Sequence, residues 1–291
     1  MKKKIKLIVI LGPTGSGKTD LAIFLCRKFN GEIISADSRQ IYKEMNIGTA
    51  KTIPEDIPIY LINLISPDKK FTVAQYKKLA NKKIKEIARK GKIPFLVGGT
   101  GLYIEAVCEG LEIPKIPPQE ELRKKLEKKD LKELVKELLK LDPEAKNYVD
   151  LKNKRRVIRA LEVCKISKKP FTFQLRKKKP SYEILKIGIK IDRKKLYKKL
   201  EKRVDKMIKK GLKKEVEYLV KKYGWEAPGL DSIGYKEFKL FKDLEKVARE
   251  IKKNTKNYAK RQITWFKRDK EIFWIRNKKE AEKLVKKFLE I

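Results

Sequence analysis

The sequence of 291 residues has no histidine, only three cysteines and no long apolar run, and each scarcity narrows the function. Without histidine, a proton transfer must use a carboxylate, lysine, tyrosine, cysteine or water. Cys26, Cys108 and Cys164 form no C-x-x-C pair, which argues against a structural zinc site. Few, scattered thiols suit a reducing cytoplasm. No apolar run approaches the length of a membrane span.

Negative charge is scarce as well. Lysine and arginine number 77 against 38 aspartate and glutamate, and of the resulting net charge of +39, +30 lies beyond residue 112. A field of this sign attracts polyanions such as nucleic acid or an anionic membrane surface. Adaptation to high temperature also enriches lysine, but it normally raises glutamate in parallel, and here lysine runs well ahead. We therefore favour a polyanionic partner.

The first third of the chain alternates strand and helix patterns. Continuous apolar runs predict buried strands at Ile5–Leu11, Glu32–Ala36 and Ile93–Val97. Helical spacing predicts helices at Asp20–Phe29 and Thr72–Lys90. Strands that alternate with helices in this way predict an α/β fold with a parallel sheet and crossover connections.

The alternation stops near residue 113, where prolines mark a linker, and resumes near residue 181. Helical patterns at Gln119–Leu141 and Asn153–Ile166 fill the interval, followed by the basic segment Lys168–Pro180. Its Phe171 and Phe173 could stack on bases, although packing within this region is the favoured use. Later elements are predicted at Ile184–Ile191, Arg193–Lys210, Leu212–Tyr223, Leu244–Asp269 and Glu271–Ile275. We predict a core of residues 1–112 and 181–291, interrupted by an all-helical insertion of residues 113–180.

The most specific motif follows the first predicted strand and precedes the first helix. It fits G-x-x-x-x-G-K-[ST] in full as Gly12-Pro13-Thr14-Gly15-Ser16-Gly17-Lys18-Thr19. Its glycines let successive backbone N–H groups converge on phosphate oxygens, and the helix N-terminus adds a favourable dipole. Lys18 adds a positive charge, and the Thr19 hydroxyl can ligate Mg²⁺. The motif predicts a P-loop NTPase-like core that binds a di- or triphosphate; a glycine turn without a ligand is the weaker alternative.

Two observations on carboxylates bear on the reaction. NTPase motors and switches need an acidic residue at the end of a core strand to hold the metal's water shell, but Ile93–Val97 runs into Gly98-Gly99-Thr100-Gly101. Asp37, directly after Glu32–Ala36, should face the phosphate loop, because strands of a doubly wound sheet end at the ligand crevice. A small-molecule or nucleoside kinase that uses ATP stays open. So does a structural use of Asp37 as the cap of the next turn.

Taken in order, several segments resemble the tRNA dimethylallyltransferase (tRNA isopentenyltransferase) family, in its bacterial form, over Leu7 to about Ile275. Besides the phosphate loop, the matching segments are Ser35-Ala36-Asp37-Ser38-Arg39-Gln40-Ile41-Tyr42, Met45-Asn46-Ile47-Gly48-Thr49-Ala50-Lys51, Val97-Gly98-Gly99-Thr100-Gly101-Leu102-Tyr103, Arg159-Ala160-Leu161-Glu162-Val163, Ser232-Ile233-Gly234-Tyr235 and Ala259-Lys260-Arg261-Gln262-Ile263-Thr264-Trp265-Phe266. One segment alone could arise by chance, but the ordered set is highly specific.

The resemblance implies transfer of a dimethylallyl group from dimethylallyl diphosphate to N6 of the adenosine at position 37 of tRNA, immediately 3′ of the anticodon. Diphosphate leaves from the phosphate loop, with Mg²⁺ as cofactor. Asp37 would take the N6 proton, and Thr100 would touch the reacting adenosine or the bridging oxygen. Arg203 matches the family arginine that holds the leaving diphosphate, a role that suits a fixed guanidinium. Without the resemblance, Arg203 would be one more charge on a solvated helix face.

The resemblance also implies contacts with the tRNA anticodon stem-loop, whose target base must be turned out of the loop to react. The corresponding positions here are Asp37, Ser38, Arg39, Gln40, Thr100, Arg155, Arg156, Val157, Ile158 and Arg159. The family has Gln-Arg where this chain has two consecutive arginines, Arg155-Arg156, so the first of these contacts differs from the family pattern.

A stripe of cationic residues on the predicted helix Leu244–Asp269 is an independent sign of RNA binding. At about 100° per residue, Lys253, Lys256 and Lys260 share one face, and none has a glutamate four residues before it. Solvated helix faces usually mix such glutamates with their lysines. We therefore interpret these three lysines as contacts to the phosphate backbone of RNA.

The rival functions explain less of the sequence. A kinase would not account for the +30 beyond residue 112, and a non-catalytic P-loop RNA-binding protein would not account for a complete phosphate loop beside Asp37. We predict a Mg²⁺-dependent tRNA dimethylallyltransferase that acts as a monomer in the cytoplasm and binds no membrane.

Overall fold

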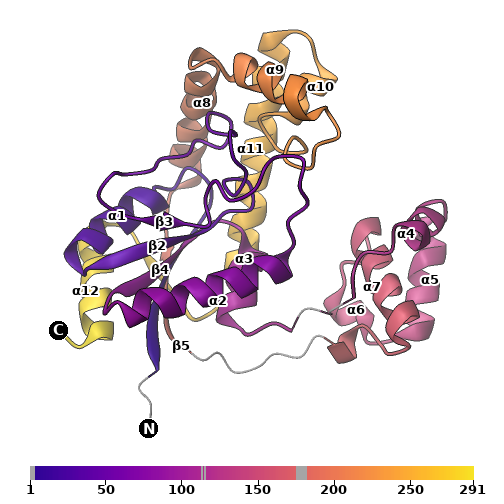
Figure 1. Cartoon of the computed structure of the whole chain (residues 1–291), viewed down its shortest axis with the longest axis horizontal. Coiled ribbons are helices and arrows are strands. Elements are labelled where there is room, and N and C mark those ends of the chain that lie inside the picture. The colour runs from indigo at the N-terminus through magenta and orange to yellow at the C-terminus, as the bar shows by residue number, and fades with distance from the viewer. Residues whose placement is uncertain (1–3, 113, 115, 175–181) are drawn as a thin grey trace. The chain divides into compact units, whose positions relative to one another are not determined.

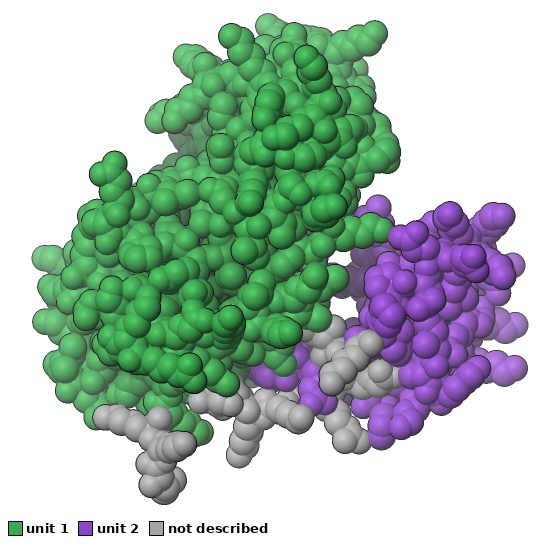
Figure 2. Space-filling view, viewed as in Figure 1, with its two compact units in different colours: residues 1–108, 181–291 green, residues 109–180 purple. Residues whose placement is uncertain are grey.

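A computed structural model describes residues 4–291 except residues 113, 115 and 175–181. The chain separates into two units, the first formed by residues 1–108 and 181–291 and the second by residues 109–180 (Figure 2). Each unit has its own hydrophobic core. The basic segment Lys168–Pro180 falls partly outside the described residues.

The first unit is built on a six-stranded sheet in which every neighbouring pair is parallel, in the order β3-β2-β4-β1-β5-β6 (Figure 1). The strands are β1 (Ile5–Leu11), β2 (Gly31–Ala36), β3 (Ile59–Tyr60), β4 (Ile93–Gly98), β5 (Tyr182–Ile189) and β6 (Ile272–Ile275). Gly98 pairs with both Leu11 and Ala36, so β1, β2 and β4 end side by side. The parallel α/β architecture confirms the predicted fold class.

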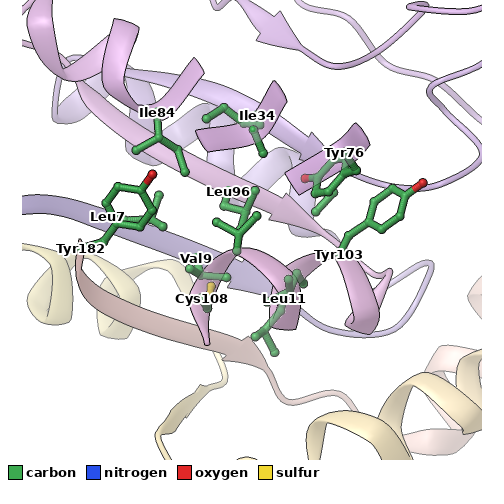
Figure 3. Close-up of a cluster of buried hydrophobic side chains, with 14 of the residues drawn as sticks. Leu7, Val9, Leu11, Ile34, Tyr76, Ile84, Leu96, Tyr103, Cys108 and Tyr182 are labelled. Atoms are coloured by element: carbon green, nitrogen blue, oxygen red, sulfur yellow. The ribbon is translucent and has the colours of Figure 1, made fainter. Parts of the chain in front are cut away.

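Helices cover both faces of this sheet because β1 is apolar on both of its sides. Leu7, Val9 and Leu11 face α2 (Val73–Arg89) and α3 (Gly101–Cys108), as Figure 3 shows. The alternate residues Ile8 and Ile10 pack with α1 (Lys18–Lys28) and α12 (Lys278–Leu289). A strand covered on both faces reads as a continuous apolar run, which is why the sequence revealed it.

Four further helices form a second cluster beyond the sheet in Figure 1. They are α8 (Arg193–Lys209), α9 (Leu212–Tyr223), α10 (Lys236–Leu240) and α11 (Leu244–Phe266). Their apolar faces pack against Ile41, Tyr42 and Met45 of the loop that follows β2. This packing fixes a loop that would otherwise be an open connection on the ligand side of the sheet. No helix among the described residues is long and apolar enough to cross a membrane.

The second unit contains α4 (Glu120–Glu127), α5 (Leu131–Leu141), α6 (Ala145–Tyr148), α7 (Lys154–Ser167) and the 3-10 turn η1 (Thr172–Gln174). The prediction of one helical stretch over Gln119–Leu141 was wrong, because the helix breaks and Asp130 caps α5 by accepting a hydrogen bond from the Lys132 amide. Phe171 packs against the core of this unit, as favoured, whereas Phe173 is exposed.

Candidate active site

The phosphate-loop motif, residues 12–19, starts directly after β1 and runs into the first turn of α1, in the strand-to-helix context that the sequence predicted. Gly17 caps the N-terminus of α1, and the Lys18 ammonium donates to the Pro13 carbonyl at 2.7 Å. The Ser16 hydroxyl is buried and has no hydrogen-bond partner among the described residues. A buried hydroxyl inside a loop of this kind fits an incoming phosphate oxygen, because without one it would bear a desolvation cost of about 1–3 kcal/mol.

Asp37 lies immediately after β2, where the sequence predicted it. Its Oδ1 accepts hydrogen bonds from the backbone amides of Arg39 at 2.8 Å and Gln40 at 3.3 Å. The capping contact considered from the sequence therefore exists. The side chain remains half-buried, and Oδ2 accepts no hydrogen bond from the described residues, so it is available for chemistry.

Electrostatics link Asp37 with Lys18 and Arg203. Burial lowers the pKa of Lys18 to about 8, while the negative charge of Asp37 opposes this shift and the positive charge of Arg203 adds to it. Burial also lowers the pKa of the Arg203 guanidinium, again opposed by Asp37. These three residues share one site, although Lys18 and Arg203 are 185 positions apart in the sequence.

Arg203 reaches the phosphate loop from α8. Its Nη1 donates to the Thr14 hydroxyl at 3.2 Å, and its Nη2 donates to the Thr49 carbonyl at 3.2 Å. The guanidinium is therefore held at the mouth of the phosphate loop and is only half-exposed. From spacing alone it would have been a solvated charge, so the resemblance, and not the helical pattern, identified it.

Thr100 follows β4 on the glycine turn and links this turn to the end of β2. Its hydroxyl accepts from the Ser38 amide at 3.0 Å, and its own amide donates to the Ala36 carbonyl at 3.1 Å. Gly98 explains why β4 does not end in a carboxylate: a Cβ there would lie 2.1 Å from the Ala36 oxygen. Close packing of β4 on β2 thus excludes a side chain at the end of this strand.

Two charged residues that the sequence analysis did not assign hold the loop after β2. The carboxylate of Glu215, on α9, accepts from the amides of Asn46, Ile47 and Gly48 at 2.7–3.0 Å. The Lys51 ammonium donates to the Tyr42 carbonyl and to two asparagine side chains, and burial lowers its pKa to about 8. Lys51 is the last residue of a segment that matched the family, so the sequence could have identified it. Nothing in the helical pattern around Glu215 distinguishes this residue.

The described residues contain no group of three His, Cys, Asp or Glu side chains placed to hold a metal. A divalent ion would therefore need oxygens from a bound phosphate as well as from the protein. Thr19, the predicted ligand, is half-buried in the first turn of α1.

The structure corrects part of the predicted tRNA surface in the second unit. Arg155 and Arg156 are exposed at the start of α7. Val157 and Ile158, in contrast, are buried in the core of this unit, so their side chains are packing residues rather than RNA contacts. Arg159 is paired with the buried Glu162 at 2.5 Å and donates to the Ile116 carbonyl at 2.9 Å, so its guanidinium is committed within the unit.

Two lysines of the stripe on α11 have acidic partners. Lys253 pairs with Glu250, three residues earlier, at 3.2 Å, and Lys256 pairs with Glu201 of α8. Neither lysine has a glutamate at i−4, as the sequence indicated, but each has an acidic partner elsewhere, at i−3 or on another helix. Lys260 is exposed.

The predicted RNA contacts beside Asp37 differ in exposure. Arg39 is exposed, whereas Gln40 is half-buried and donates to the Thr49 carbonyl at 3.3 Å.

Comparison with known proteins decides the family. The model of the IPP transferase family matches residues 40–269. The chain belongs to this family, the tRNA dimethylallyltransferases. The tRNA dimethylallyltransferase of Halothermothrix orenii is 45% identical over 283 residues, covering 92% of this chain and 86% of the relative. That of Acetivibrio thermocellus is 45% identical over 298 residues, covering 96% and 95%. These matches confirm the resemblance and the class of enzyme, a transferase.

Solved structures of the family share the fold. The tRNA isopentenylpyrophosphate transferase of Bacillus halodurans superposes with a TM-score of 0.75 at 36% identity, covering 99% of this chain and 97% of that one. A eukaryotic dimethylallyltransferase described as acting on tRNA superposes with a TM-score of 0.82 at 30% identity, covering 94% and 74%. Both likenesses span nearly the whole chain, including the inserted helical unit.

The lowered pKa of Lys18 predicts how anion binding depends on pH. Below about pH 8 the ammonium is charged, and above it the free protein must take up a proton to bind an anion, so affinity should fall by about tenfold per pH unit. Calorimetry with inorganic pyrophosphate would measure this. Lys18→Arg, which stays charged throughout, should lose the fall and retain only the titration of pyrophosphate itself. An equal fall in both proteins would assign the titration to another group, such as Lys51.

Proposed function

We propose that this chain transfers a dimethylallyl group from dimethylallyl diphosphate to N6 of the adenosine at position 37 of tRNA and releases diphosphate. The observation that carries the proposal is the meeting of Lys18, Asp37 and Arg203 at one edge of the sheet. This combination offers an anion site and a proton acceptor side by side. The names of the relatives point to the same reaction.

The phosphate loop and Arg203 would bind the diphosphate from two sides. Lys18 and the Ser16 hydroxyl lie in the loop, and Arg203 approaches Thr14 from α8. Negative charge grows on the diphosphate as the carbon–oxygen bond breaks, so fixed cations stabilise the transition state more than the bound substrate. The Thr19 hydroxyl together with diphosphate oxygens would hold Mg²⁺, which supplies further positive charge to the leaving group.

Asp37 would accept the proton of the adenosine amine. The N6 lone pair attacks the allylic carbon, the bond from that carbon to the diphosphate oxygen breaks, and one N6 proton passes to the carboxylate. N6 is a weak nucleophile, because its lone pair is delocalised into the purine ring, so removing its proton assists the attack. Oδ1 is held by two backbone amides, which leaves Oδ2 as the basic atom. Thr100, bonded to Ser38 beside Asp37, would contact the adenosine.

The RNA would be bound by cations of both units. Arg155 and Arg156 are the exposed cations of the predicted set in the second unit, and Arg39 is exposed beside Asp37. On α11, Lys260 is exposed, while Lys253 and Lys256 would have to exchange a carboxylate for a phosphate.

Replacing Lys253, Lys256 and Lys260 with glutamine should make tRNA binding less sensitive to salt. Each lost phosphate contact lowers the slope of log affinity against log salt by about 0.7–0.9. Titrations of tRNA at several salt concentrations measure this slope. The matched control replaces the exposed Lys279, Lys283 and Lys287 of α12, which removes the same charge elsewhere. Equal slopes in the two triple variants would return the α11 stripe to a solvated surface.

The direct test of the proposed reaction is mass analysis of tRNA nucleosides after incubation with dimethylallyl diphosphate. We expect an adenosine heavier by one dimethylallyl group in place of one hydrogen, and one diphosphate released per transfer. Hydrolysis of ATP or phosphorylation of a small molecule at about 1 s⁻¹ or faster would support the kinase instead. Tight tRNA binding without any modified adenosine would support the non-catalytic RNA-binding protein.

A further inference from the structure

Gln262 is a buried polar residue on α11 that touches two parts of the candidate active site. Its Oε1 accepts from the Thr14 amide of the phosphate loop at 2.8 Å, and its Nε2 donates to the Gly99 carbonyl of the turn after β4 at 2.8 Å. The side chain is only 6% exposed. Because a backbone amide can only donate and a carbonyl can only accept, the two partners fix the orientation of the side-chain amide.

The surroundings of Gln262 leave no room for a side chain at either glycine of the turn after β4. A Cβ on Gly99 would lie 2.2 Å from Nε2, and a Cβ on Gly101 would lie 2.4 Å from the ring of Trp265, one turn further along α11. Thr100 lies between these two glycines, and the Tyr258 side chain, also on α11, interacts with it. One face of α11 thus holds the whole turn that carries Thr100.

Thr14 is held from two helices at once. Gln262 of α11 accepts a hydrogen bond from the Thr14 amide, and Arg203 of α8 donates one to the Thr14 hydroxyl. The amide of Thr14 is therefore committed to Gln262 and that of Ser16 to the Pro13 carbonyl, so an anion would have to use other amides of the loop. Removing the Gln262 contact would leave the Thr14 amide without its hydrogen bond and would make Thr14, the partner of Arg203, less firmly positioned.

We propose that Gln262 is a positioning residue that keeps the phosphate loop and the Thr100 turn in register for dimethylallyl transfer. The inference rests on the proposed function and deepens it, since Gln262 acts through Thr14 and Gly99 rather than on a substrate. Holding reacting groups in register matters because a displacement of about 1 Å can cost about 10²-fold in rate.

Two near-isosteric variants separate positioning from packing. Gln262→Met keeps the volume but makes neither hydrogen bond. Gln262→Glu, when ionised, still accepts from the Thr14 amide but sets a negative charge against the Gly99 carbonyl. When protonated, its carboxylic acid has one donor and one acceptor and reproduces the glutamine pattern. Burial raises a carboxyl pKa, so we expect this protonation as the pH is lowered during the test.

The test measures inorganic pyrophosphate affinity by calorimetry for wild type and both variants between about pH 8 and pH 5. Each variant is expressed as a ratio to wild type at the same pH, which removes the titration of pyrophosphate. We expect the Gln262→Met ratio to stay about tenfold below wild type at every pH, and the Gln262→Glu ratio to recover toward wild type as the pH falls. Thermal unfolding at each pH verifies that both variants are folded.

Single-turnover transfer to tRNA with both substrates saturating completes the test, with a loss of about 10- to 100-fold expected for Gln262→Met and unchanged tRNA affinity. Wild-type rates and affinities in both variants, or identical pH profiles for Met and Glu, would overturn the inference. Its failure is distinguishable from failure of the proposed function. A wild-type protein that binds pyrophosphate but yields no modified adenosine refutes the function, whereas normal transfer by Gln262→Met refutes only the positioning role.

Discussion

Replacing Arg203 with alanine should slow dimethylallyl transfer by about 10²–10³ and leave tRNA affinity nearly unchanged. The guanidinium is fixed by Thr14 and Thr49 before any substrate arrives, so little reorganisation opposes its use in the transition state. Its partial burial strengthens its interaction with a growing negative charge. Single-turnover rates with saturating substrates measure the loss directly.

Lys18→Ala should cause a loss of the same order, because this ammonium lies in the phosphate loop that would bind the diphosphate. Lys202→Ala is a matched control, since it removes one exposed positive charge from the same helix as Arg203. It should transfer at the wild-type rate. A large loss of tRNA binding in Arg203→Ala or Lys18→Ala, with normal transfer once tRNA is saturating, would place that residue on the RNA surface instead.

The sheet could be predicted because its determinants are local. A strand buried on both faces must be apolar throughout, and β1 was predicted with its observed bounds, Ile5–Leu11. Helix α9 was also predicted with its observed bounds, Leu212–Tyr223, from its helical spacing. The short edge strand β3 and helix α3 were missed. β3 has only two residues, and α3 follows a glycine turn that reads as a loop.

Contacts between distant segments could not be predicted from pattern. Asp37 was placed at the correct strand end, but nothing in α8 or α11 shows that Arg203 and Gln262 meet at Thr14. Val157 and Ile158 belong to a matched segment, and only packing reveals that they are buried. The family resemblance could single out Arg203 because a family pattern reflects contacts in three dimensions, whereas the periodicity of one helix does not.

The largest effect is expected for Asp37→Asn, which should reduce the chemical step by about 10²–10⁴, the usual range for a general base. With no histidine in the chain, the N6 proton needs another acceptor. Asp37 is the carboxylate whose negative charge acts to raise the pKa of both Lys18 and Arg203. Asparagine can still accept hydrogen bonds from the Arg39 and Gln40 amides through its single side-chain oxygen, so the turn after β2 should keep its conformation. It cannot take up a proton.

The measurement must distinguish two roles of Asp37, as a general base and as the cap of the turn after β2. Asparagine distinguishes them because it can cap the turn but cannot act as a base. Single-turnover rates with tRNA and dimethylallyl diphosphate both saturating isolate the chemical step, while titrations of each substrate should give nearly wild-type affinities. Asp231→Asn, at an exposed aspartate of the same unit, controls for loss of one negative charge. If Asp37→Asn reacts within a few-fold of wild type, Asp37 only holds the turn, and water or the leaving diphosphate takes the proton.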